Sequence, residues 1–159
     1  MVHIPQALIL IAFSFGAAIF HSLLGVERSV WSIATSETSL VEDRDLRFVR
    51  QALFGLSSYL PPSNGIVILV GVTGLIWQGV ALHWTWPATV VFAAWLVGQI
   101  YILTFGRIMQ AVRYLRRTDN TSAIVDVRLA VRQLIRQHFN GYLHAATIIV
   151  LELALIISK

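Results

Sequence analysis

Four polar side chains that could do chemistry lie inside long apolar runs of this sequence or directly after one: His21, Arg107, Asn140 and His144. Two facing imidazoles can be the axial ligands of a b-type haem, and an arginine can pair with a haem propionate. The set therefore suggests a site for haem or another ligand, with haem b as the candidate cofactor. The alternative is structural: each histidine hydrogen-bonds a neighbouring helix, and Arg107 extends its charge to the membrane surface.

The depth of these residues is counted from the arginines that border the apolar runs. His21 lies seven residues before Arg28, and His144 lies eight residues after Arg136. At about 1.5 Å per residue, these spacings place the rings about 10 and 12 Å inside the same boundary. Asn140 lies one turn before His144, on the same helix face. We therefore expect one polar zone in one half of the protein.

Composition indicates which elements position these residues. Of 159 residues, 57% are hydrophobic and 13% are charged, whereas a soluble domain carries about 25% charge. Four apolar runs, each near the ~20 residues that cross a bilayer, occupy positions 5–25, 52–79, 86–106 and 139–158. We predict an all-α fold: an up-and-down bundle of four transmembrane helices that forms one domain over residues 1–159. No cysteine is present, so thiolate and iron–sulfur chemistry are excluded.

The arginines predict the orientation of the bundle. All eleven lie in residues 26–51 and 107–138, between the apolar runs. The positive-inside rule then places both segments in the cytoplasm and both termini outside it. The arginine-rich, lysine-poor usage fits a bacterium, so we expect a multi-pass protein of the bacterial inner membrane, with anionic lipids at its arginine-rich face. The formal net charge of +4 reflects this orientation and does not indicate a nucleic-acid surface.

One stretch interrupts the second apolar run, "LSSYLPPSNGIVIL" at residues 56–69. Proline lacks the N–H that a helix interior needs, so we predict that the second helix is broken at Pro61 and Pro62. Counted along a helix that enters the membrane at Arg50, the prolines lie about 17 Å below the membrane surface, near the middle of the bilayer. The freed carbonyls need partners that lipid lacks. Four side chains are suited to supply them: Ser57, Ser58, Ser63 and Asn64. The break is either a kink or a discontinuous helix that lines a binding site.

Glu152 is an acid inside the fourth apolar run, seven residues before Lys159. That spacing places it roughly 10 Å below the outer surface. A carboxyl group at that depth must be protonated, paired or in contact with a partner helix. Three roles remain open for it: a neutral hydrogen-bonded group, a proton or ion site, and a contact with another subunit.

Three arginines at spacing four, Arg128, Arg132 and Arg136, predict one stripe of a helix that leads into the fourth span. Thr121 or Ser122 could cap the start of that helix. The third helix should likewise continue past Arg113. Together they predict a basic cytoplasmic hairpin, whose partner is either anionic lipid headgroups or another protein.

Three segments carry a resemblance to a known group. They are "LFGLSSYLPPSNGIVILVGVTGLIWQG", "HWTWP" and "WLVGQIYILTFGRIMQAVR". Over residues 46–117 the chain resembles a family of bacterial four-span membrane proteins, which is distantly similar to CopD-type copper-resistance membrane domains and HemJ-type protoporphyrinogen oxidases. The resemblance implies a four-helix bundle with tetrapyrrole-binding or metal-binding relatives. We infer no catalytic residue and no metal site from it.

Three functional classes remain. The first, which we favour, is a small non-catalytic accessory or stabilising subunit that packs against a larger bacterial membrane complex or against copies of itself. The second is a haem or tetrapyrrole-binding electron-transfer protein that uses His21 and His144. The third is a small transporter that uses the broken helix and Glu152. The sequence does not decide whether the protein is an enzyme, and it favours a protein without enzymatic activity.

Overall fold

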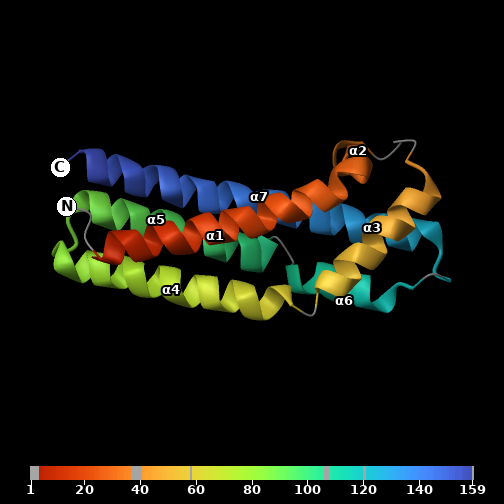
Figure 1. The fold of residues 1–159 in the computed structure, drawn as a ribbon, viewed down its shortest axis with the longest axis horizontal. Helices are drawn as coiled ribbons and strands as arrows, with labels where there is room; N and C mark the ends of the chain where they lie inside the picture. Colours follow the sequence, from red (N-terminus) through yellow and green to blue (C-terminus); the bar gives the residue numbers. More distant parts are fainter. Residues whose placement is uncertain (1–3, 37–40, 58, 106–107, 120, 159) are drawn as a thin grey trace.

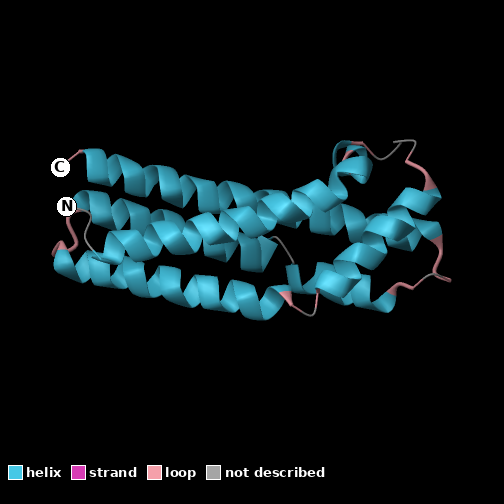
Figure 2. Cartoon of the chain, viewed as in Figure 1, coloured by secondary structure: helices cyan, strands magenta, loops and turns pink. Residues whose placement is uncertain are grey.

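The computed structural model describes residues 4–36, 41–57, 59–105, 108–119 and 121–158. Within these ranges every regular element is a helix (Figure 2). Four segments are long and apolar enough to cross a membrane: Ile4–Val30, Ser63–Ala81, Trp86–Thr104 and Ile124–Ile157. The structure thus supports the predicted all-α, multi-pass membrane protein.

Four long helices form the bundle: α1 (Ile4–Glu27), α4 (Leu60–Ala81), α5 (Trp86–Ile100) and α7 (Ile124–Ile157). They run alongside one another, and α1 packs closely on both α4 and α7 (Figure 1). The α5 helix packs more lightly, on α4 and α7. Both ends of the chain lie beside the turn that joins α4 to α5 (Figure 1). We call this the terminal end of the bundle.

The opposite end of the bundle carries a second helical layer. It consists of the 3₁₀ turn η1 (Arg28–Val30), α2 (Ser32–Thr35), α3 (Asp43–Leu56), α6 (Ile108–Arg117) and the first half of α7. We call this layer the cap. It has its own hydrophobic core, which contains Leu23, Val30, Ile33, Leu46, Val49, Leu53, Ala111, Leu115, Val127, Val131, Leu134 and Ile135. The segments predicted to connect the spans are therefore largely a folded unit.

The α1 and α4 helices approach each other closely at small residues. A Cβ atom on Gly74 of α4 would lie 2.9 Å from Cγ1 of Ile9 and 3.1 Å from the backbone oxygen of Pro5. Even an alanine at position 74 would therefore push the two backbones apart. Small residues at helix contacts are the usual route to close packing in membranes.

The helical path is interrupted just before the two prolines, and Pro61 and Pro62 lie in the first turn of the helix that follows. The α3 helix ends at Leu56, and α4 begins at Leu60 with the prolines in its first turn. The first turn is the position where a missing N–H leaves no helical bond unmade. This helix begins at Leu60, eight residues later than the predicted start of the span at position 52.

The polar residues around this turn supply the hydrogen bonds that it needs. Ser57 Oγ donates to the Phe54 oxygen at 2.7 Å, and Ser63 Oγ donates to the Tyr59 oxygen at 3.1 Å. Asn64 is half-buried in α4. Ser58 lies outside the described residues.

Arginine side chains bind backbone carbonyls at three helix ends of the cap. Arg116 Nη2 donates to the Ser57 oxygen at the end of α3 at 3.3 Å. Arg136 donates through Nε and Nη2 to the Ala34 oxygen at the end of α2 at 3.2 and 3.0 Å. Arg50 Nη2 donates to the oxygens of Leu115 and Thr118 at the end of α6. The last carbonyls of a helix have no partner within it, and these guanidinium groups provide one.

The predicted stripe of Arg128, Arg132 and Arg136 is therefore at least partly engaged inside the cap. Like Arg136, Arg128 donates to a backbone oxygen, that of Val41, at 3.3 Å. Arg132 is half-buried. Two of the three charges thus hold the cap together, which leaves less of the stripe for an outside partner.

The turn before α7 is held by one carboxylate. Asp119 accepts hydrogen bonds from the backbone and hydroxyl groups of Thr121 and Ser122. These bonds lower the pKa of Asp119 to about 2, so the group is ionised at neutral pH. The N-cap residue of α7 is Ala123, whose side chain makes no hydrogen bond to the start of the helix. The prediction that Thr121 or Ser122 caps this helix is therefore wrong, because both side chains bind Asp119.

Replacing Arg50 by methionine should destabilise the cap. Arg50 is only 8% exposed, and its loss leaves the carbonyls at the end of α6 without a charged donor. A hydrogen bond to a charged group contributes about 1.5–3 kcal/mol, and we expect a loss of this size in the free energy of unfolding. Chemical unfolding in detergent, followed by circular dichroism, measures it. Arg44→Met is the matched control, because Arg44 is exposed and has no hydrogen bond within the described residues. Equal losses for both variants would contradict the role assigned to Arg50.

Candidate functional sites

The structure does not bring His21 and His144 together. The His21 ring is exposed on α1 and lies 6.0 Å from the Tyr142 ring, between ring centroids. The His144 ring lies against Gly98 of α5 and 6.5 Å from the Phe13 ring. Tyr142 and His144 are two residues apart on α7, so they point to different sides of that helix. The sequence predicted that the two rings lie at the same depth in the membrane, but it could not predict the direction in which each ring points.

His144 instead belongs to a polar row on α7 with Asn140 and Gln137. The spacing of four and three residues places them on one helix face, and His144 shows that this face is turned to α5. Nε2 of His144 and Oε1 of Gln137 are buried and have no hydrogen-bond partner among the described residues. Nε1 of Trp95 on α5 is in the same situation. Arg107, predicted to join this zone, lies outside the described residues.

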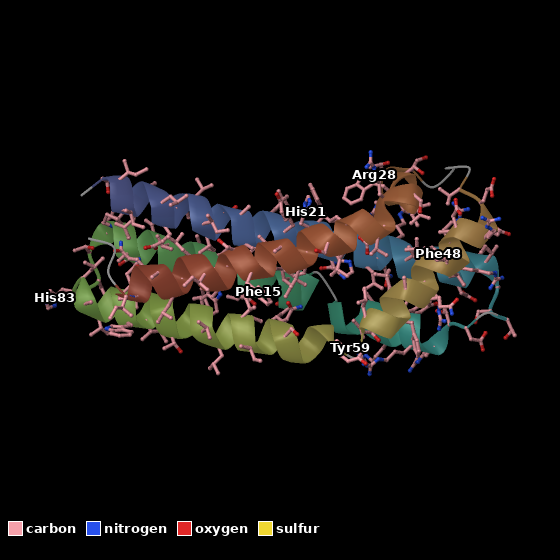
Figure 3. All side chains as sticks on the ribbon, in the orientation of Figure 1. Phe15, His21, Arg28, Phe48, Tyr59 and His83 are labelled. Carbon is pink, nitrogen blue, oxygen red and sulfur yellow. The ribbon has the colours of Figure 1, made fainter. Side chains whose placement is uncertain are left out.

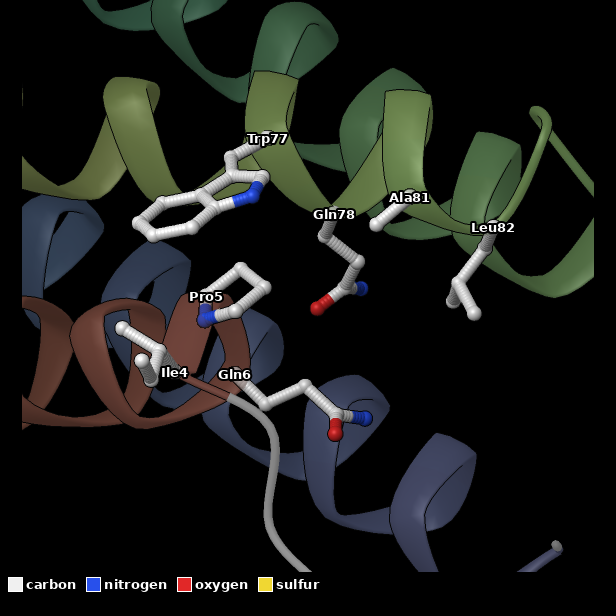
Figure 4. Close-up of a pocket in the computed structure, with 7 residues that line it drawn as sticks. All are labelled: Ile4, Pro5, Gln6, Trp77, Gln78, Ala81 and Leu82. Atoms are coloured by element: carbon white, nitrogen blue, oxygen red, sulfur yellow. The ribbon is translucent and has the colours of Figure 1, made fainter.

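A small pocket opens between α1 and α4 at the terminal end of the bundle. Its volume is about 300 Å³, and Gln6 and Gln78 extend their carboxamides into it (Figure 4). Its walls are mainly apolar and consist of Ile4, Pro5, Trp77, Ala81 and Leu82. Both glutamines are almost fully buried, so the pocket has a polar base and an apolar rim.

Glu152 lies behind this pocket and is fully buried. Gln78 Nε2 donates a hydrogen bond to Oε2 of Glu152 at 2.9 Å. This bond fixes the orientation of the Gln78 amide and leaves its Oε1 without a partner among the described residues. The acid is thus held within the bundle by a neutral donor from α4.

A second buried acid, Glu27, pairs with His138. Oε1 of Glu27 lies 2.6 Å from Nδ1 of His138, and both side chains are buried where α1 ends against α7. Sequence reasoning missed this pair, although the signal was present. Glu27 is next to Arg28 and His138 is two residues after Arg136, so the depth count used for His21 would have placed them together.

Within the described residues, no three His, Cys, Asp or Glu side chains gather as a metal site would require. No protein-family model, curated protein or solved structure matches this chain. The resemblance to CopD-type and HemJ-type membrane domains therefore stays a prediction. Function must be argued from the geometry of this chain alone.

The buried pair should be strongly coupled. We expect Glu27→Leu and His138→Leu each to lower the free energy of unfolding by about 3 kcal/mol, because each leaves its partner buried and unpaired. The double variant should lose much less than the sum, because two apolar side chains replace the pair. Chemical unfolding of the four proteins in detergent measures the coupling energy. Additive losses would show that the two groups do not depend on each other.

Proposed function

We propose that this chain is a small non-catalytic accessory subunit of a larger membrane complex, in the bacterial inner membrane, with the cap in the cytoplasm. The arginine distribution supports this orientation, since all eleven arginines lie between the apolar runs whose connections form the cap. In this proposal the chain works by packing: its third span, α5, is the surface that meets the partner.

The observation that carries the proposal is the low burial of the third span. Only 11% of that span is buried within the chain, against 28% of each of the other three. Its exposed side chains include Leu96, Val97, Ile100 and Leu103. Helix association in membranes depends on close packing, and α5 makes little of it within this chain. Most of its surface is therefore available to another helix.

A polar side chain on the same helix adds to this argument. Gln99 is half-buried and makes no hydrogen bond within the described residues. Hydrocarbon offers no partner to a carboxamide, and glutamine is one of the residues that hydrogen-bond across membrane helices. Directly after α5 the chain forms a π-helical segment, η2 (Tyr101–Phe105), and such segments occur frequently at functional sites. We infer that a partner helix packs beside Gln99.

The two other classes receive less support. A bis-histidine haem needs both rings to face one space, and His21 and His144 face different sides of α7. A transport site in a broken helix needs the break in the middle of a spanning helix, and Pro61 and Pro62 lie in the first turn of α4 instead.

Single cysteines test the proposed contact cleanly, because the chain has none of its own. Leu103→Cys lies one turn beyond Gln99, and Ile66→Cys on α4 is the matched control. These side chains are 65% and 64% exposed, and both lie near the cap end of their spans. With a thiol-reactive cross-linker in native membranes, we expect an adduct of one defined mass from position 103 and none from position 66.

The hydrogen bond to the partner is tested by adding Gln99→Leu to the position 103 variant. We expect the adduct yield to fall about threefold, since interhelical hydrogen bonds contribute roughly 0.6 kcal/mol on average in membranes. The purified chain should keep its stability, because Gln99 makes no side-chain hydrogen bond within the described residues. Equal adducts from positions 66 and 103, or a product with the mass of two chains, would contradict an accessory role through α5.

A further inference from the structure

A groove crosses the surface where α1 and η1 meet α7, at the cap end of the spans. Its volume is about 330 Å³. His21 and Arg28 mark its two ends on the same side of the molecule (Figure 3). They are seven residues apart, which corresponds to about 10 Å along the helix axis. The groove is distinct from the α5 surface discussed above.

Two aromatic contacts between α1 and α7 frame the groove. The His21 ring lies 6.0 Å from Tyr142, and the Trp31 ring meets Phe139 edge-on at 5.7 Å. Gly25 lies between these contacts on α1, and a Cβ atom there would meet nothing within 4 Å. The groove is therefore open because residue 25 has no side chain, and its walls are mainly apolar.

Arg28 gives one end of the groove a positive charge that the chain does not use. Arg47, Arg50, Arg116, Arg128 and Arg136 all donate to backbone carbonyls. Arg28 is exposed and has no hydrogen bond or ion pair within the described residues. Its neighbour Glu27 is turned inward to His138. No carboxylate among the residues that line the groove offsets the charge of Arg28.

The position of the groove indicates what occupies it. The apolar segment that contains α1 ends at Val30, two residues after Arg28. Arg28 therefore lies at the level of lipid headgroups, where tryptophan and tyrosine are also enriched. We propose that the groove binds one anionic phospholipid, with its phosphate on Arg28 and an acyl chain over Gly25 between the two aromatic contacts. The apolar walls favour a lipid over a free phosphate ion.

Native mass spectrometry of the detergent-purified chain tests the proposal, with phosphatidylglycerol and phosphatidylcholine as the added lipids. We expect the wild type to retain phosphatidylglycerol in preference to phosphatidylcholine. Gly25→Leu puts a side chain into the groove from a position where a Cβ atom meets nothing within 4 Å, so we expect the fold to be kept and lipid retention to be lost. Arg28→Gln should weaken retention of phosphatidylglycerol about fivefold, the effect of one basic residue near an anionic surface.

The matched control is Arg117→Gln, which removes an exposed arginine of the cap that has no hydrogen bond within the described residues. It should retain phosphatidylglycerol like the wild type. A thermal-shift assay adds a second readout: phosphatidylglycerol should raise the unfolding temperature of the wild type but not of Gly25→Leu. The proposal is overturned if Arg117→Gln and Arg28→Gln weaken retention equally, if Gly25→Leu still retains lipid, or if inorganic phosphate stabilises the wild type as well as the lipid does.

Discussion

The cap depends on one interaction, the hydrogen bond from an arginine side chain to a backbone carbonyl. Every helix end leaves carbonyls without intrahelical partners, and the cap packs several short helices into a small volume. Arg50, Arg116 and Arg136 provide donors at the ends of α6, α3 and α2. The same arginines, by their number, predict which side of the membrane the cap occupies. In the orientation that we propose, these charges therefore stabilise the cap and also set its side of the membrane. Arg28, Arg44 and Arg117 make no side-chain hydrogen bond within the described residues, and of these three Arg28 is the one that lines the groove.

The membrane-spanning helices follow a related rule, since hydrocarbon cannot satisfy polar groups. The buried acids of α1 and α7 are each held by a side chain of another helix: Glu27 by His138, and Glu152 by Gln78. These bonds connect α1 to α7 and α7 to α4. Other polar groups of the spans lack a partner within the described residues, among them Nε2 of His144 on α7 and the side chain of Gln99 on α5. Because α5 is also the least buried span, we propose that the partner helix packs beside it.

Sequence reasoning predicted the parts that depend on hydropathy and charge. The four apolar helices could be predicted from the lengths of the apolar runs alone. The helix that leads into the fourth span could be predicted from the spacing of Arg128, Arg132 and Arg136. It counted residues 52–79 as one broken span, because apolarity does not distinguish the end of α3 at Leu56 from the start of α4 at Leu60. It grouped His21 with His144 because counting residues gives depth but not direction around a helix. The Gln78–Glu152 contact depends on how helices rotate against one another, which packing decides.

In the topology that we propose, four spans hold the folded cap on one side of the membrane and the α4–α5 turn on the other. Labelling of single cysteines with a membrane-impermeant maleimide tests it most directly. Val125→Cys and Phe54→Cys replace exposed side chains of the cap, and His83→Cys replaces an exposed one in the turn. In intact cells position 83 should react and positions 54 and 125 should not, and inverted vesicles should reverse the pattern. Labelling of positions 83 and 125 from the same side, or protection of position 54 from both sides, would contradict the account.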